Sequence, residues 1–217
     1  MELNIAELRA QAERLIHDLP DGDPLDGVSI ALIDLGVKAA VTSLDMAALD
    51  NAMKAAHQAG ASIAQMQETI ALISGLGVHS LMLTARRLLD LAEASGEMTR
   101  CPLTPDQQAL WDQYVGTDPY WQPFEQENPG FMDALLRLSP DLFKGFHQYC
   151  AIPWKSGTVR AIIKELIAMA SDATPTHRYL PGMRHHLNNA ARLGAGKIAI
   201  RHALDIAAAA PLHTGVR

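Results

Sequence analysis

Polar side chains that can exchange protons or bind anions crowd into one short part of the sequence. Three histidines, two arginines and a tyrosine lie within ten residues around a Pro181-Gly182 break: His177, Arg178, Tyr179, Arg184, His185 and His186. Glu165 precedes them, on a segment whose apolar residues recur at helical three- and four-residue steps. A solvated helix face would explain a lone glutamate there, but polar residues on a turn beside apolar helices are typical of a small-molecule site.

Acid–base chemistry is the reaction type that these side chains suit. Burial raises the pKa of a carboxyl group and a histidine titrates near neutrality, so Glu165 and His186 could shuttle a proton, with His177 as the third predicted catalytic residue. Arginine side chains hold anions well, and we predict a small anionic substrate. The predicted substrate-binding set is Arg178, Arg184, Tyr179, His185 and His213. We expect no cofactor and no bound metal.

Helices are the elements that must position this site. Hydrophobic residues make up 48% of the 217 residues and aromatic residues only 5%, and alanine is abundant in the second half, which favours an all-α fold. Apolar spacing and Gly or Pro breaks predict the helices and the changes between them. The expected helices cover 3–18, 28–42, 45–58, 62–95 (kinked near Gly75 and Gly77), 130–149, 158–172, 181–193 and 196–210.

Charge and composition exclude several classes of protein. The formal net charge is −6 and there is no Lys/Arg run, so nucleic acid is not expected as a partner. The N-terminus lacks the basic start and apolar centre of a signal peptide, and no window holds the ~18 uninterrupted apolar residues of a spanning helix. We therefore expect a cytoplasmic protein with no membrane partner. Cys101 and Cys150 lie 49 positions apart, which excludes a CxxC motif.

The chain resembles itself when it is shifted by 134 residues. When each residue from 30 to 80 is compared with the residue 134 positions later, eight of the 51 pairs are identical. They include Gly60 with Gly194 and Ala61 with Ala195. The helix breakers fall in register as well, which indicates two copies of one helical module. In the first copy, Glu165, His177 and His186 correspond to Ala31, Ser43 and Ala52, so we expect that copy to lack the chemistry.

A resemblance to a known family rests on the run KELIAMASDATPTHRYLPGMRHHLNNAARLGAG, residues 164–196. It resembles the signature of the carboxymuconolactone decarboxylase and alkylhydroperoxidase D-like superfamily. In that signature a Glu opens a helix, a polar or CxxC element follows about twelve residues later, and a His begins the next helix eight residues before a Gly-Ala turn. Glu165, His177 and His186 occupy these places, although two extra residues before His186 leave His185 or Arg184 as alternatives.

The resemblance implies the architecture and the reaction class. It implies tandem modules: an N-terminal helical module at 1–96, an aromatic and Pro-rich linker at 97–127, and a carboxymuconolactone decarboxylase-like module at 128–217. His177 and Leu180 stand where the peroxidase branch has its CxxC, so peroxide reduction through a disulfide cycle is excluded. We expect instead a lyase that uses cofactor-independent acid–base chemistry on a carboxylated lactone or a keto or hydroxy acid.

The assembly and two other functions remain open from the sequence. Single-module members commonly form rings of six, so the resemblance implies a homotrimer with pseudo-hexameric arrangement. A metal-dependent enzyme is one alternative, because Glu165, His177, His185 and His186 are of ligand types that bind zinc or iron. A non-catalytic helical oligomer or binding protein is the other, with the His and Arg cluster at a subunit interface.

Overall fold

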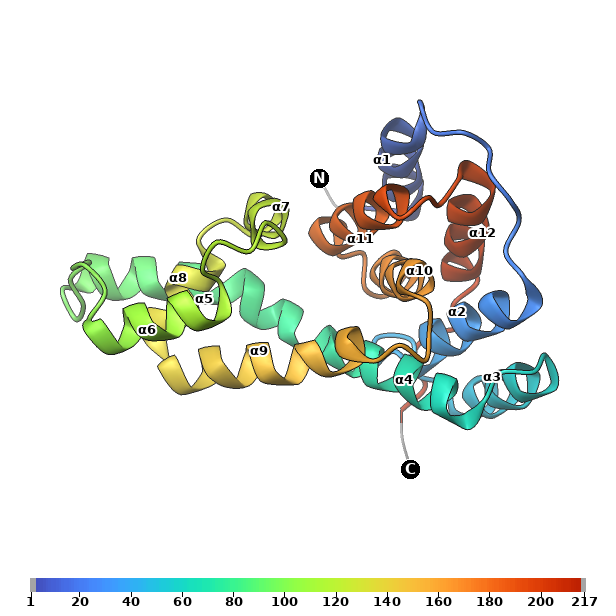
Figure 1. Cartoon of the computed structure of the whole chain (residues 1–217), viewed down its shortest axis with the longest axis horizontal. Coiled ribbons are helices and arrows are strands. Elements are labelled where there is room, and N and C mark those ends of the chain that lie inside the picture. Colours follow the sequence, from blue (N-terminus) through green and yellow to red (C-terminus); the bar gives the residue numbers. More distant parts are fainter. Residues whose placement is uncertain (1–2, 216–217) are drawn as a thin grey trace. The chain divides into compact units, whose positions relative to one another are not determined.

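The structure, a computed structural model that describes residues 3–215, is built from helices (Figure 1). No strand occurs among the described residues, which confirms the all-α prediction. The elements in chain order are α1 (Ile5–Ile16), α2 (Gly27–Ala39), α3 (Met46–Gln58), α4 (Ile63–Ile73), the 3-10 helix η1 (Ser74–Gly77), α5 (Val78–Ser95), α6 (Pro105–Tyr114), α7 (Trp121–Glu127), α8 (Phe131–Leu138), α9 (Pro140–Lys155), α10 (Ala161–Asp172), α11 (Leu180–Arg192) and α12 (Lys197–Ala208).

The chain divides into two compact units whose boundaries differ from the predicted modules. The first unit joins the residues up to Leu76 to those from Ile152 onward, and the second spans Gly77–Ala151. The expected boundaries at 96/97 and 127/128 therefore fall inside the second unit. The physical reason is that aromatic residues of the expected linker, among them Trp111, Tyr114 and Phe124, pack into a core of their own with α5 and α8.

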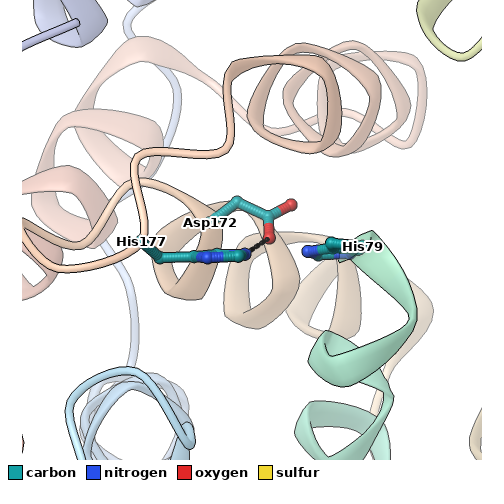
Figure 2. A group of neighbouring side chains, drawn as sticks. All are labelled: His79, Asp172 and His177. Atoms are coloured by element: carbon teal, nitrogen blue, oxygen red, sulfur yellow. Dashed lines mark ion pairs between the residues drawn. The ribbon is translucent and has the colours of Figure 1, made fainter. Parts of the chain in front are cut away.

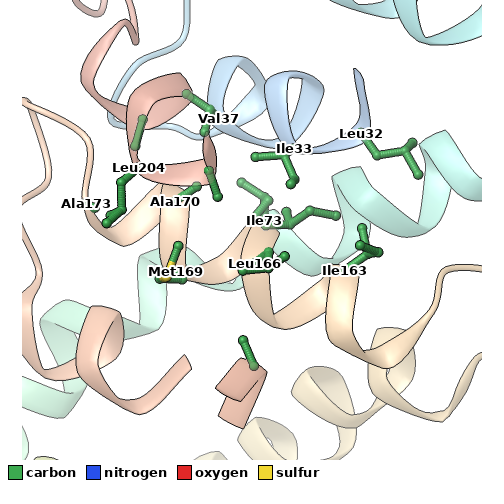
Figure 3. Packing of buried hydrophobic residues seen from close by; sticks show 14 of the residues in the cluster. Leu32, Ile33, Val37, Ile73, Ile163, Leu166, Met169, Ala170, Ala173 and Leu204 are labelled. Carbon is green, nitrogen blue, oxygen red and sulfur yellow. The ribbon is translucent and has the colours of Figure 1, made fainter. Parts of the chain in front are cut away.

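Helix α10 lies in the core of the first unit. Every residue from Ile163 to Asp172 is buried, because α2, α4, α11 and α12 all pack against this one helix. Gly36 in α2 allows a close approach, since a Cβ there would lie only 2.6 Å from Cγ2 of Ile167. Figure 3 shows side chains from α2, α4, α10 and α12 meeting in this core: Leu32, Ile33, Val37, Ile73, Ile163, Leu166, Met169, Ala170, Ala173 and Leu204.

The helices of the proposed repeat begin in register. Helices α2, α3 and α4 begin at residues 27, 46 and 63, and α10, α11 and α12 begin at 161, 180 and 197, each 134 positions later. The two Gly-Ala turns also match: Gly60 and Gly194 have φ angles of 98° and 97°, and Ala61 and Ala195 each donate a 2.9 Å hydrogen bond to the preceding helix. This left-handed turn explains the glycine at both positions. That the halves arose by duplication stays a prediction.

The starts of four helices of the first unit, α2, α3, α4 and α12, are satisfied in two ways. Asp26, Asp45 and Ser62 cap α2, α3 and α4 through their side chains. Helix α12 begins after Gly196 without a side-chain cap, and the amides of its first two residues donate instead to the main-chain carbonyls of Pro20 and Asp21. The loop after α1 thus takes the place of a cap, which leaves no room for a side chain at residue 196.

The second unit is an aromatic-rich helical cluster. His147 is buried among the rings of Tyr114, Trp121, Phe143 and Phe146, and its Nδ1 lies 2.8 Å from the Phe143 carbonyl oxygen. Burial lowers the pKa of His147, although its hydrogen bond to Phe143 acts in the opposite direction. These residues form a packed core, which explains why the predicted linker is rich in aromatic residues.

One helical stretch, Ile63–Ser95, is long and apolar enough to cross a membrane by length and composition. Those two properties do not distinguish a spanning helix from a core helix. The stretch is divided into α4, η1 and α5, and its buried Glu68 forms an ion pair with Lys164 of α10. The packing of α4 against α2 and α10 accounts for its apolar residues within the first unit.

Candidate acid–base site

The structure brings Glu165 and His186 together. Glu165 lies in α10 with only 6% of its surface exposed, so a solvated helix face does not explain it. His186 lies in α11, the helix most extensively packed against α10, and its Nδ1 is 2.7 Å from Oε2 of Glu165. An ionised carboxylate can only accept this bond, so Nδ1 is the donor, and Nε2 is left as the nitrogen that can exchange a proton.

The pKa of His186 is set by one influence that lowers it and three that raise it. Burial lowers the pKa of the imidazole, because it disfavours the charged form. The hydrogen bond to Glu165, the negative charge of Glu165 and, where Asp172 is ionised, its charge together outweigh burial, so the pKa of His186 is raised above its ordinary value of 6.5. Contact with Glu165 therefore favours the protonated form of the His186 imidazole.

An aromatic ring stacks on the imidazole of His186. The indole of Trp154, in the last turn of α9, lies almost parallel to it, with an interplanar angle of 9° and ring centroids 5.9 Å apart. A cation over an indole face at this separation is attracted by the electrons of the ring. The imidazole is thus in contact with a carboxylate through one nitrogen and with an aromatic face.

A second carboxylate–histidine pair involves Asp172 and His177 (Figure 2). Asp172 lies seven residues after Glu165, which places both carboxylates on one side of α10. Its Oδ1 is 3.6 Å from Nε2 of His177, which is a long separation for an ion pair. The third labelled side chain in Figure 2, His79, belongs to the second unit.

The Asp172–His177 pair favours the neutral form of both groups. Burial raises the pKa of Asp172 to about 8, against the opposing positive charge of His186, and burial lowers the pKa of His177 to about 4. Tyr179 stacks on His177, with ring centroids 5.6 Å apart. His177 is the residue that the resemblance places where the peroxidase branch has its CxxC. At neutral pH Asp172 is therefore mainly a carboxylic acid.

The structure separates His185 from His186. His185 is buried, and its Nε2 lies 3.2 Å from the side-chain amide of Asn189 on the same helix. Burial, reinforced by the charges of His186 and Arg192, lowers the pKa of His185 to about 3. Of the three residues considered for the family histidine, His186 has a 2.7 Å hydrogen bond to Glu165. Arg184, half-buried, lies two positions before His186 and so projects from a different face of α11.

The remaining predicted substrate-binding residues make other contacts. Arg178 has a left-handed φ of 50°, and its guanidinium donates a 2.9 Å hydrogen bond to the carbonyl of Leu3, which ties the start of the chain to this turn. His213 is exposed beyond the end of α12, in a tail whose Thr214 donates to Leu44 and Asp45 at the start of α3. Their substrate-binding roles stay predictions.

Sequence reasoning missed Asp172 and Trp154. Asp172 carries a usable signal, because its spacing of seven from Glu165 puts it on the same helix face. Trp154 carries none, since nothing local relates it to a histidine 32 positions later. A buried Lys164–Glu68 ion pair of 2.5 Å, beside Glu165 in the sequence, was missed for the same reason.

Comparison with models of known families and with curated protein sequences finds no match. The structure resembles the 1.70 Å crystal structure of a provisionally assigned gamma-carboxymuconolactone decarboxylase subunit from Burkholderia xenovorans LB400. The TM-score is 0.72 and the sequence identity 25%, over 95% of this chain and 91% of that one. The fold is therefore an all-α fold of the carboxymuconolactone decarboxylase type. This likeness supports the resemblance to the carboxymuconolactone decarboxylase and alkylhydroperoxidase D-like superfamily that the sequence indicates.

Proposed function

We propose that the chain is a cofactor-independent lyase that acts on a small carboxylated lactone or on a keto or hydroxy acid. The observation that carries the proposal is the 2.7 Å contact between His186 and Glu165, both placed in the helix pair α10–α11 of a carboxymuconolactone decarboxylase-like fold. A buried base and acid in direct contact, with one imidazole nitrogen left for a substrate, suit proton transfer to carbon.

In the proposed reaction, the bond between the substrate and its carboxylate carbon breaks and carbon dioxide leaves. The electron pair stays on the substrate as a delocalised anion. The His186 imidazolium donates its Nε2 proton to one carbon of that anion, and the neutral imidazole then regains a proton from water. Glu165 holds Nδ1 throughout and stabilises the imidazolium, and the imidazolium supplies the positive charge that favours an anionic substrate.

Asp172 is a second proton carrier in the same proposal. Its carboxyl group is buried and protonated at neutral pH, and its charge state is linked to that of His186. A neutral acid and an imidazolium on one helix pair allow protonation and proton return to be divided between two groups. Tyr179 and His177 lie against this acid and could contact the substrate.

Two measurements test the proposal. A thermal-shift screen of carboxylated lactones, keto acids and hydroxy acids finds ligands of the native state, because a ligand that binds only the folded protein raises its melting temperature. Turnover of the ligands found is then followed by carbon dioxide release in the wild type, Glu165→Gln and His186→Ala. Loss of turnover in both variants with the fold retained supports the proposal, and unchanged turnover contradicts it.

Assembly as a homotrimer belongs to the same proposal. Support comes from the superfamily resemblance and from three exposed leucines on α5, Leu83, Leu88 and Leu91, which give that helix an apolar surface. Light scattering coupled to size-exclusion chromatography should give three times the mass of one chain. A monomer at micromolar concentration would contradict the assembly without affecting the proposed chemistry.

A further inference from the structure

Trp154 is held in place by a buried charge network that comes from both halves of the first unit. The Lys164 ammonium, 3% exposed, lies 2.5 Å from Oε1 of Glu68 in α4, whose side chain is 5% exposed. The same ammonium donates to the carbonyls of Pro153 at 2.6 Å and Ser156 at 2.5 Å. These two carbonyls bracket Trp154 along the chain, so the three donors of one lysine are directed to the end of α9 and to Glu68.

Glu68 binds the same segment through hydrogen bonds to its other carboxylate oxygen. Oε2 of Glu68 accepts a 2.6 Å hydrogen bond from the Ser156 hydroxyl and a 3.3 Å bond from the amide of Val159. The chain from Pro153 to Val159 is therefore fixed at four points by one buried ion pair. The last carbonyl groups of a helix have no hydrogen-bond donors within that helix. At the end of α9 the Lys164 ammonium is such a donor.

We infer that Trp154 is a positioning residue for His186, and that the buried Lys164–Glu68 pair keeps its indole stacked on the imidazole. The inference rests on the proposed function, since it assigns His186 the proton-transfer role. Moving the segment that carries Trp154 would break the hydrogen bonds that it makes with the buried charges of Lys164 and Glu68, which is costly away from water. Glu68 comes from the copy that lacks the acid–base residues, which gives that copy a part in the site.

The stacked indole stabilises the protonated imidazole. Its face attracts a cation at the observed ring separation of 5.9 Å. The other groups that act on His186 are Glu165 and Asp172 on α10, with His185 on its own helix. Removing the indole leaves these groups unchanged, so a change in the titration of His186 reports on Trp154 alone.

The test measures the titration of His186 by nuclear magnetic resonance in the full-length protein, which needs no substrate. The variants are Trp154→Phe, Trp154→Leu and the double variant Lys164→Met with Glu68→Gln, which replaces the ion pair by neutral side chains of similar size. Arg160→Gln is the matched control, because Arg160 directly follows that segment and binds Asp26 and Ser29 through an exposed and a part-buried contact.

The expected result is a graded fall in the pKa of His186. Trp154→Leu should lower it most, Trp154→Phe less, and Arg160→Gln should leave it unchanged. In the double variant the Trp154 indole N–H resonance should follow the His186 titration with a smaller amplitude than in the wild type. Turnover of an identified substrate should fall about tenfold in kcat for Trp154→Leu, with a smaller change in KM.

An unchanged His186 titration in Trp154→Leu, or in the folded double variant, would overturn the inference. If the double variant fails to fold, the two Trp154 variants still decide the role of the indole. Failure of the proposed function would give a different result. The Trp154 variants would still change the titration of His186, but His186→Ala would leave turnover unchanged.

Discussion

The carboxylate of Asp172 occupies the space in which a side chain at residue 182 would lie. A Cβ built on Gly182 would be 2.9 Å from Cγ of Asp172 and 2.7 Å from Cδ1 of Tyr179. Gly182 lies near the start of α11, so the absence of its side chain lets that helix approach the end of α10 where Asp172 is buried. The Pro181-Gly182 break in the sequence therefore has a packing role in the site.

Gly182→Ala should destabilise the protein by about 1–3 kcal/mol, because the added methyl overfills a closed contact. The loss is measured by urea unfolding. Asp172→Ala introduced into the Gly182→Ala chain should recover part of it, since it removes the colliding carboxylate. Gly145→Ala is the matched control: no atom lies within 4 Å of a Cβ there, and the residue is in a helix, so a small gain is expected. Equal effects at both glycines would contradict this account of Gly182.

Glu165→Gln should lower the pKa of His186. The glutamine keeps a side-chain oxygen near Nδ1 but removes the negative charge that, together with the hydrogen bond, raises the pKa above 6.5. Nuclear magnetic resonance of the histidine ring follows the titration, and turnover should fall by about 10²–10⁴-fold if the pair transfers a proton. An unchanged His186 titration would show that Glu165 does not set its charge state.

His185→Gln should make the protein less sensitive to acid. The pKa of His185 falls from 6.5 to about 3 on folding. Between these two pH values His185 is therefore protonated in the unfolded chain and neutral in the folded chain. Stability from this group is present above pH 6.5 and is lost as the pH falls towards 3, by up to about 1.4 kcal/mol per pH unit. Urea unfolding between pH 7 and pH 4 should show a shallower slope in the variant, whose side-chain oxygen can still accept from Asn189. An identical slope would contradict the prediction.

Asp172→Asn should make the stability of the protein less dependent on pH between pH 5 and pH 8. The pKa of Asp172 rises from 3.8 to about 8 on folding, so its contribution is fully present below pH 3.8 and is lost as the pH rises through 8. Asparagine does not ionise, so the variant should lose less stability than the wild type between pH 5 and pH 8. Asp50→Asn, at an exposed position on α3, is the control and should keep the wild-type slope. A wild-type slope in Asp172→Asn would mean that the carboxyl titrates normally.

The helices of the first unit could be predicted closely from the sequence, and its unit boundaries could not. The apolar spacing and the glycines at 60 and 194 place α2–α4 and α10–α12 within a few residues of the predicted ranges. The segment 97–127 shows only that it has aromatic residues to bury. Which elements bury them depends on contacts with α5 and α8, and local sequence carries no signal for such partners.

The sequence by itself determined the all-helical fold and the neighbourhood of the site, because helix formation and the crowding of residues 177–186 depend on positions a few turns apart. Only the tertiary structure decided which of these groups are charged and what they contact. His185 and His186 are neighbours in the sequence, but one is buried and neutral while the other meets Glu165 and Trp154. Glu68 reaches Lys164 from 96 positions away. Burial and the close approach of distant helices set the pKa values and pairings, and both exist only after the chain has folded.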